Sequence, residues 1–94
     1  MQGDYDTIIK PKKRYMKEKK SDKAKRLFLA GDIKGALGIY KSFPYGFTKE
    51  EKRAIEIAHE SLAGNENFYR SIGINTAEMI NRSKEIIINK YINN

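Results

Sequence analysis

The sequence predicts an all-α protein, a small bundle of four to five short helices with a basic, partly disordered N-terminal arm. Apolar residues recur at spacings of three and four in several segments, and no stretch alternates apolar and polar residues as a half-buried strand would. Helix-capping residues and glycines bound these segments. The 94 residues suffice for one domain. We therefore expect the arm over residues 1–20 and a single helical domain over residues 21–94.

The first two predicted helices follow one another closely. Ser21 is the predicted N-cap of the first helix, and Gly31 is expected to end it. Asp32 is the predicted cap of the second helix, and Pro44 is expected to break the chain after it. The apolar residues of the two helices share their inward faces and are predicted to enter the core: Ala24, Leu27, Phe28, Ile33, Ala36, Leu37, Tyr40 and Phe43.

The third predicted helix has the clearest start signal. Thr48 and Glu51 have the spacing of a capping box, in which each side chain accepts a hydrogen bond from the other residue's backbone N–H. The helix is expected to stop at Gly64. Its predicted buried stripe consists of Ala54, Ile55, Ala58 and Leu62.

The last predicted helix follows a short segment over residues 66–72 that ends at Gly73. Asn75 and Thr76 compete as the cap of this helix. Three consecutive isoleucines within it are β-prone, but the helical pattern around them is longer. Its inward face is predicted to consist of Met79, Ile80, Ser83, Ile86, Ile87 and Tyr91.

Positive charge is concentrated near the N-terminus. Residues 10–26 contain ten Lys or Arg and two acidic residues, whereas the other 77 residues contain nine basic and ten acidic ones. Such a segment binds polyanions by releasing counterions, so nucleic acid of unknown type is the predicted partner; the alternative is a solvated tail. The predicted contacts are Lys10, Lys12, Lys13, Arg14, Lys17, Lys19, Lys20, Lys23, Lys25 and Arg26, with Tyr15 placed to stack on an exposed base.

Residues 68–79 resemble a helix-turn-helix. Ile72, Gly73 and Ile74 fit the turn, and Met79 fits the inward position, whereas Tyr69 stands where that motif usually has a small residue. The alternative is an ordinary corner between two helices of the bundle. The resemblance implies that Asn75, Thr76, Glu78, Asn81 and Arg82 face a major groove and that Arg70 and Lys84 reach phosphates.

Residues 43–47 contain three aromatic side chains. Phe47 precedes the Thr48 cap, which is the hydrophobic-staple position. The other rings are predicted to plug one end of the core, and the alternative is an exposed anchor for a protein partner, which the burial of Tyr45 distinguishes. The last helix leaves Ile88 and Ile92 off its main stripe, which is compatible with a homodimer. The protein-contact candidates are Phe43, Tyr45, Phe47, Ile88 and Ile92.

Several classes of chemistry find no support in the sequence. The chain has no cysteine and one histidine, so we expect no metal site, no cofactor and a cytoplasmic setting. The longest apolar run is four residues, so no membrane span is expected. Glu56, His59 and Glu60 share a helical face, but Lys52 and Arg53 lie one turn earlier and predict a solvated ion-pair face. We expect a protein that is not an enzyme.

Short segments that resemble known proteins also suggest what kind of genome encodes the chain. Residues 27–43, which include Gly31-Asp32, resemble the turn and second helix of a single tetratricopeptide repeat, and one copy predicts only a local helical hairpin. With Gly46-Phe47-Thr48 and Phe68-Tyr69-Arg70, the chain is similar over residues 25–91 to small helical proteins of bacteriophages and mobile elements. That likeness implies origin and setting only.

The predicted function is nucleic-acid binding in a regulatory or accessory role, by the arm and with contacts from the Gly73 corner. Two alternatives stay open. One is a protein-interaction inhibitor of a host or defence enzyme, which would bind an acidic protein surface. The other is a structural accessory of a phage particle.

Overall fold

The computed structural model describes residues 18–93, which form helices joined by short loops and contain no strand. A helical turn kinked at Gly64, Ser61–Asn65, follows α4, and a π-helical turn, Ile88–Ile92, follows α6. The all-α prediction is confirmed, whereas residues 1–17 of the predicted arm lie outside the described residues. The α-helices are α2 (Lys20–Leu29), α3 (Ile33–Tyr40), α4 (Lys49–Glu60), α5 (Glu66–Ser71) and α6 (Thr76–Ile87).

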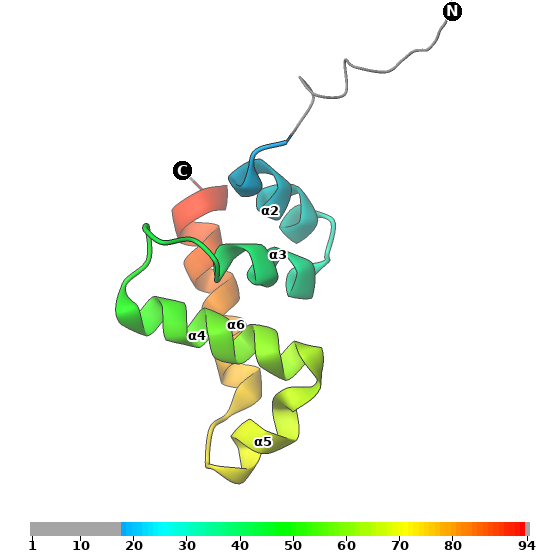
Figure 1. Ribbon diagram of the computed structural model, residues 1–94, viewed down its shortest axis with the longest axis vertical. Helices are drawn as coiled ribbons and strands as arrows, with labels where there is room; N and C mark the ends of the chain where they lie inside the picture. The colour runs from blue at the N-terminus through cyan, green and yellow to red at the C-terminus, as the bar shows by residue number, and fades with distance from the viewer. Residues whose placement is uncertain (1–17, 94) are drawn as a thin grey trace, which may run out of the picture.

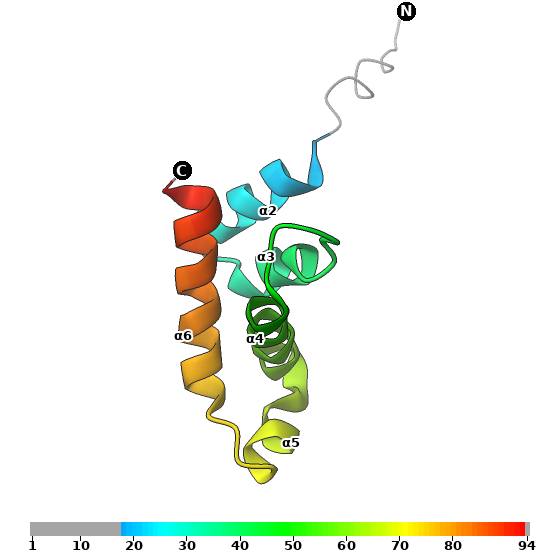
Figure 2. The ribbon, with the colours of Figure 1, turned by 90° about the vertical axis from the view of Figure 1, so that its left-hand side faces the viewer.

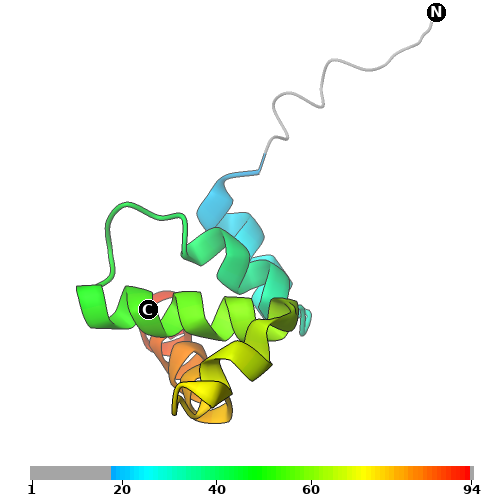
Figure 3. The same ribbon diagram turned by 60° about the horizontal axis from the view of Figure 1, so that its bottom comes forward.

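The helices pack as successive neighbours. α2 packs against α3, α3 against α4, and α4 against α6. Figure 1 shows α2, α3 and the C-terminus at one end of the molecule and α5 at the other, with α4 between them. Figure 2 shows α6 running along the molecule beside these helices, and Figure 3 shows α4 crossing it.

The core lies where α2, α3, α4 and α6 meet. Its largest fully buried apolar side chains are Leu37, Tyr40, Ile55 and Ile87, all of them predicted core residues. Burying a side chain of this size stabilises the fold by about 1.5–3 kcal/mol. Partly buried residues pack against the core and include the predicted Leu27, Phe28, Ile33, Phe43, Met79, Ile80 and Tyr91.

Side-chain caps begin α3, α4 and α6 as predicted. Asp32 accepts from the N–H of Gly35 at 2.9 Å, and the capping box between Thr48 and Glu51 is complete. Asn75, not Thr76, caps α6 by accepting from the N–H of Glu78 at 3.0 Å. Each cap satisfies a backbone donor that the first helical turn leaves without a partner.

The predicted cap at Ser21 is wrong. α2 begins at Lys20, after Lys19 in an extended conformation, and no side chain caps it. The N–H of Lys23 already donates to the carbonyl of Lys19 at 2.9 Å, so Ser21 lies inside the first turn. The helix therefore begins one residue before Ser21, whose side chain is of a type that caps helices.

The helical segment that begins with α4 ends at Gly64, as predicted. Helical backbone continues beyond Glu60 into Ser61–Asn65, where Gly64 leaves the helical conformation with a φ of +114° and kinks the chain. The prediction that Leu62 is buried is wrong: it lies in this last turn, next to the kink, and is 39% exposed.

Candidate nucleic-acid interface

The described part of the cationic segment lies on α2 and on the residue before it. Lys19, Lys20, Lys23 and Lys25 are all exposed, and within residues 18–93 none of them forms an ion pair. Four ammonium groups therefore stand in solvent within seven residues of chain. Strongly hydrated point charges of this kind suit contacts with phosphate oxygens.

Arg26 differs from these lysines. Its Nε and Nη2 donate to the two carboxylate oxygens of Glu18 at 3.0 and 3.1 Å. This hydrogen bonding lowers the pKa of Glu18 and raises the pKa of Arg26. Both side chains are exposed, so water screens the pair and a phosphate group can compete for the guanidinium.

The packing of α2 decides where its charges lie. Ala24 is fully buried, and Leu27 and Phe28 pack against the core beside α3. The charged residues of the helix are left on its solvent side. Residues 18–29 contain five basic and two acidic side chains, whereas residues 30–93 contain nine basic and eight acidic ones. The charge asymmetry predicted from the sequence therefore persists within the described residues.

The other predicted contacts of the arm fall on residues 10–17, which lie outside the described residues. The predictions for these side chains are therefore without a structural account: Lys10, Lys12, Lys13, Arg14, Tyr15 and Lys17.

The predicted contacts around the Gly73 corner differ in their exposure to solvent. Thr76 is 4% exposed, and its hydroxyl donates to Glu66 at 2.9 Å. The prediction that Thr76 faces a nucleic acid is therefore wrong, because this side chain closes the corner between α5 and α6. Lys84 is half-buried. The exposed candidates are Arg70, Asn75, Asn81 and Arg82, of which Asn75 has its amide oxygen engaged as the cap.

The charge around the Gly73 corner is balanced rather than basic. Glu78 and Glu85 are exposed on α6 together with Arg82. The Tyr69 hydroxyl donates to Glu60, which fastens α5 to the end of α4 and raises the pKa of Tyr69. The bulky side chain at the position where a helix-turn-helix usually has a small residue thus has a structural partner.

The aromatic segment divides between core and solvent. Phe43 and Phe47 pack edge-on to Tyr40, with ring centroids 5.5 and 6.2 Å from its own, and both also contact Tyr91. The core-plug prediction is therefore right for Phe43, and the assignment of Phe43 and Phe47 as exposed protein contacts is wrong. The core-plug prediction is wrong for Tyr45, which lies between them in sequence and is 84% exposed.

The C-terminal protein-contact candidates are also less exposed than predicted. Ile88 and Ile92 are both half-buried, and Ile92 packs against the core. The π-helical turn over Ile88–Ile92 changes the facing of the last residues, so a stripe extended at regular helical spacing misplaces them. Ile92 is not the exposed dimer contact that the sequence predicts.

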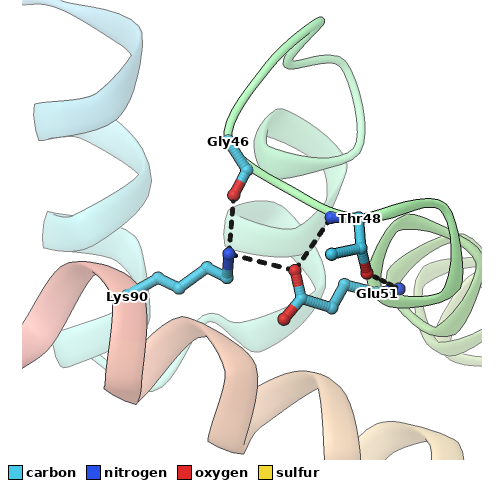
Figure 4. Close-up of polar contacts among 4 residues, drawn as sticks. All are labelled: Gly46, Thr48, Glu51 and Lys90. Carbon is cyan, nitrogen blue, oxygen red and sulfur yellow. Dashed lines mark hydrogen bonds and ion pairs between the residues drawn. The ribbon is translucent and has the colours of Figure 1, made fainter.

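A polar cluster fastens the loop over residues 41–48 to the C-terminal helix (Figure 4). The Lys90 ammonium donates to the carbonyl of Gly46 at 2.9 Å and pairs with Glu51 at 3.0 Å. Glu51 also accepts from the N–H of Thr48 at 2.9 Å. The bond from the Thr48 N–H, followed by Lys90, lowers the pKa of Glu51. Sequence analysis missed Lys90, since no local pattern links residues 44 positions apart.

His59 does not belong to the predicted solvated ion-pair face. Its ring lies against Gly38 of α3, where an added Cβ would meet Nε2 at 3.0 Å, and its buried Nδ1 has no hydrogen-bond partner among residues 18–93. Burial, followed by Lys41 and Lys34, lowers the pKa of His59. Lys52 donates to the carbonyl of Phe43 at 2.8 Å instead of pairing with a glutamate of its own helix.

Residues 18–93 contain no group of three or more acidic or histidine side chains arranged to hold a metal ion. No helix in that range is both long enough and apolar enough to cross a bilayer. No protein family, curated protein or solved structure matches the chain.

Proposed function

We propose that the protein binds nucleic acid through its cationic segment, residues 10–26, with the described part of the contact on α2. The proposal rests on one observation: Lys19, Lys20, Lys23 and Lys25 are exposed together and form no ion pair within residues 18–93. An origin in a phage or mobile element and a regulatory or accessory role belong to the same proposal. The role is one of binding, not of catalysis.

The physical basis is counterion release. A cation that neutralises a phosphate frees a condensed ion, so the logarithm of the binding constant falls with the logarithm of salt concentration by about 0.9 per contact on duplex DNA and about 0.7 on a single strand. Lys19, before α2, and three lysines on α2 can neutralise phosphates in this way. Because α2 is already folded against α3, its lysines need no ordering of the backbone on binding.

The test compares two double variants of the full chain that remove equal charge. K20Q/K23Q removes two exposed cations from α2, and the control K34Q/R53Q removes two exposed cations outside the cationic segment. Fluorescence anisotropy with labelled duplex and single-stranded oligonucleotides is measured over a range of salt concentrations. K20Q/K23Q is expected to reduce the steepness of the salt dependence by about 1.8 on duplex or about 1.4 on single strands.

The control variant is expected to keep most of the wild-type salt dependence. If both variants weaken binding equally, the binding reflects net charge alone and the assignment to α2 is wrong. If the wild-type chain binds neither oligonucleotide at low salt, the proposed function is wrong.

A protein-binding role is the second candidate. Phe68 on α5 and Ile72, the residue that follows this helix, are 60% and 57% exposed. Exposed apolar side chains of this size suit an apolar contact with a protein. This candidate takes first place if the full chain binds no nucleic acid.

A further inference from the structure

Tyr45 is exposed in a segment that otherwise packs inward. Phe43 and Phe47 lie two residues to either side of it and contact each other and Tyr40, whereas Tyr45 is 84% exposed. The two packed rings thus anchor both sides of the loop and leave the tyrosine at its tip. Tyrosine has a flat apolar ring with one polar group, so it can stack on another ring in water.

The loop is held in place by contacts on both sides of this tip. Lys52 from α4 donates to the carbonyl of Phe43, and Lys90 from beyond α6 donates to the carbonyl of Gly46 (Figure 4). Gly46 has a φ of +100°, which favours glycine, and an added Cβ there would lie 3.1 Å from the Tyr91 hydroxyl. The backbone that presents Tyr45 is therefore ordered before any ligand arrives.

The loop lies at the cationic end of the molecule. Figures 1 and 2 both place the segment between α3 and α4 at the same end as the start of α2, and α5 at the opposite end. The helix that carries the exposed lysines and the loop that presents Tyr45 therefore lie at the same end of the molecule. A positive surface combined with an aromatic ring is the arrangement with which proteins bind single-stranded nucleic acids.

We propose that Tyr45 stacks on an unpaired base and that the protein therefore binds single-stranded nucleic acid in preference to duplex. The inference rests on the proposed function, because the lysines of α2 hold the phosphate backbone. In a duplex each base is already stacked on its neighbours and paired, so the ring of Tyr45 has no free face to contact. A single strand offers such a face at every nucleotide, whatever the sequence.

The first experiment places a fluorescent reporter at the tip. The chain contains no tryptophan, so Y45W has a single one, and F68W is the matched control with its tryptophan at the α5 end. Each full-length variant is titrated with oligo(dT) of about 15 nucleotides, within the usual site size of single-strand-binding domains. Stacking predicts quenching of Y45W fluorescence and no change for F68W. A duplex of equal length is expected to leave both signals unchanged.

The second experiment measures affinity with Y45S. Loss of one base stack is expected to weaken oligo(dT) binding about 5- to 160-fold and to leave the steepness of the salt dependence unchanged. Duplex binding is expected to stay at the wild-type level, and thermal unfolding by circular dichroism checks that Y45S remains folded.

The outcomes separate this inference from the proposed function. If wild-type protein binds oligo(dT) while Y45S binds equally well and Y45W is not quenched, the stacking role is wrong and nucleic-acid binding stands. If wild-type protein binds neither probe, both proposals are wrong.

Discussion

The two ends of the molecule both expose an aromatic ring, but they support it differently. At one end, the loop with Tyr45 is held by Phe43 and Phe47 in the core and by Lys90. At the other end, α5 has six residues, none of them buried, and Phe68 is 60% exposed. α2, with its exposed lysines, lies at the first end, whereas both acidic and basic side chains are exposed near the second.

This difference shows that exposure alone says little about what a side chain does. A ring on a backbone fixed by distant contacts is preorganised for binding and loses little conformational entropy on contact with a ligand. A ring on a short helix with few tertiary contacts belongs to the part of a fold that opens locally with least free energy.

The largest expected effect is on the free energy of unfolding. L37A removes a fully buried side chain of α3 at the first end and is expected to destabilise the protein by about 2–5 kcal/mol. F68A trims an exposed side chain at the other end and is expected to change stability by at most about 0.5 kcal/mol. Urea denaturation followed by circular dichroism measures both. Equal losses of stability in L37A and F68A would contradict the conclusion that packing supports the first end more than the second.

K90M tests the long-range link to the loop. It removes the hydrogen bond to Gly46 and the ion pair with Glu51, both partly exposed, and is expected to cost about 1 kcal/mol of stability. K84M, which changes a half-buried lysine on α6, is the control. Hydrogen exchange of the loop amides is expected to accelerate in K90M alone. Unchanged exchange in K90M would show that the aromatic packing suffices to hold the loop.

A pH effect is expected from Glu51. Its pKa lies below the ordinary value of 4.5, so the folded chain holds this proton less tightly than the unfolded chain. The carboxylate therefore stabilises the fold above that value, and the contribution is lost as pH falls through the folded pKa. E51Q is expected to be less stable than wild type at neutral pH, by under about 1 kcal/mol, and the difference is expected to shrink as pH falls through the folded pKa of Glu51. Thermal unfolding over a series of pH values from neutral to acidic checks this, and a difference that does not depend on pH would contradict it.

The smallest expected effect is on the salt dependence of binding, and it tests whether the position of a charge matters. E18Q removes the carboxylate that engages Arg26, which frees the guanidinium for a phosphate. The salt dependence of oligonucleotide binding is expected to steepen by up to about 0.9 on duplex DNA. E78Q removes the same charge from α6 and is expected to leave that dependence unchanged. An equal response of the two variants would show that net charge, not its position, governs binding.

Parts of the candidate site were predictable, and others were not. The lysines of α2 stand out in the sequence because charge density is a local property, and a charged helix face stays exposed unless it pairs. The burial of Thr76 depends on Glu66, ten residues earlier, and the anchoring of Tyr69 depends on Glu60. No local sequence pattern identifies Glu66 or Glu60 as these partners. The structure therefore corrects the predicted contacts with a major groove.

The sequence by itself determined the helical class, the caps at Asp32, Thr48 and Asn75, and most of the core, because these depend on interactions within about four residues. The tertiary structure alone decided that Leu62 and Tyr45 face solvent, that Ile92 packs inward, and that Lys90 meets Gly46. Such outcomes arise when segments far apart in the chain pack together, and they also depend on the kink at Gly64 and on the π-helical turn over Ile88–Ile92, which regular helical spacing does not anticipate.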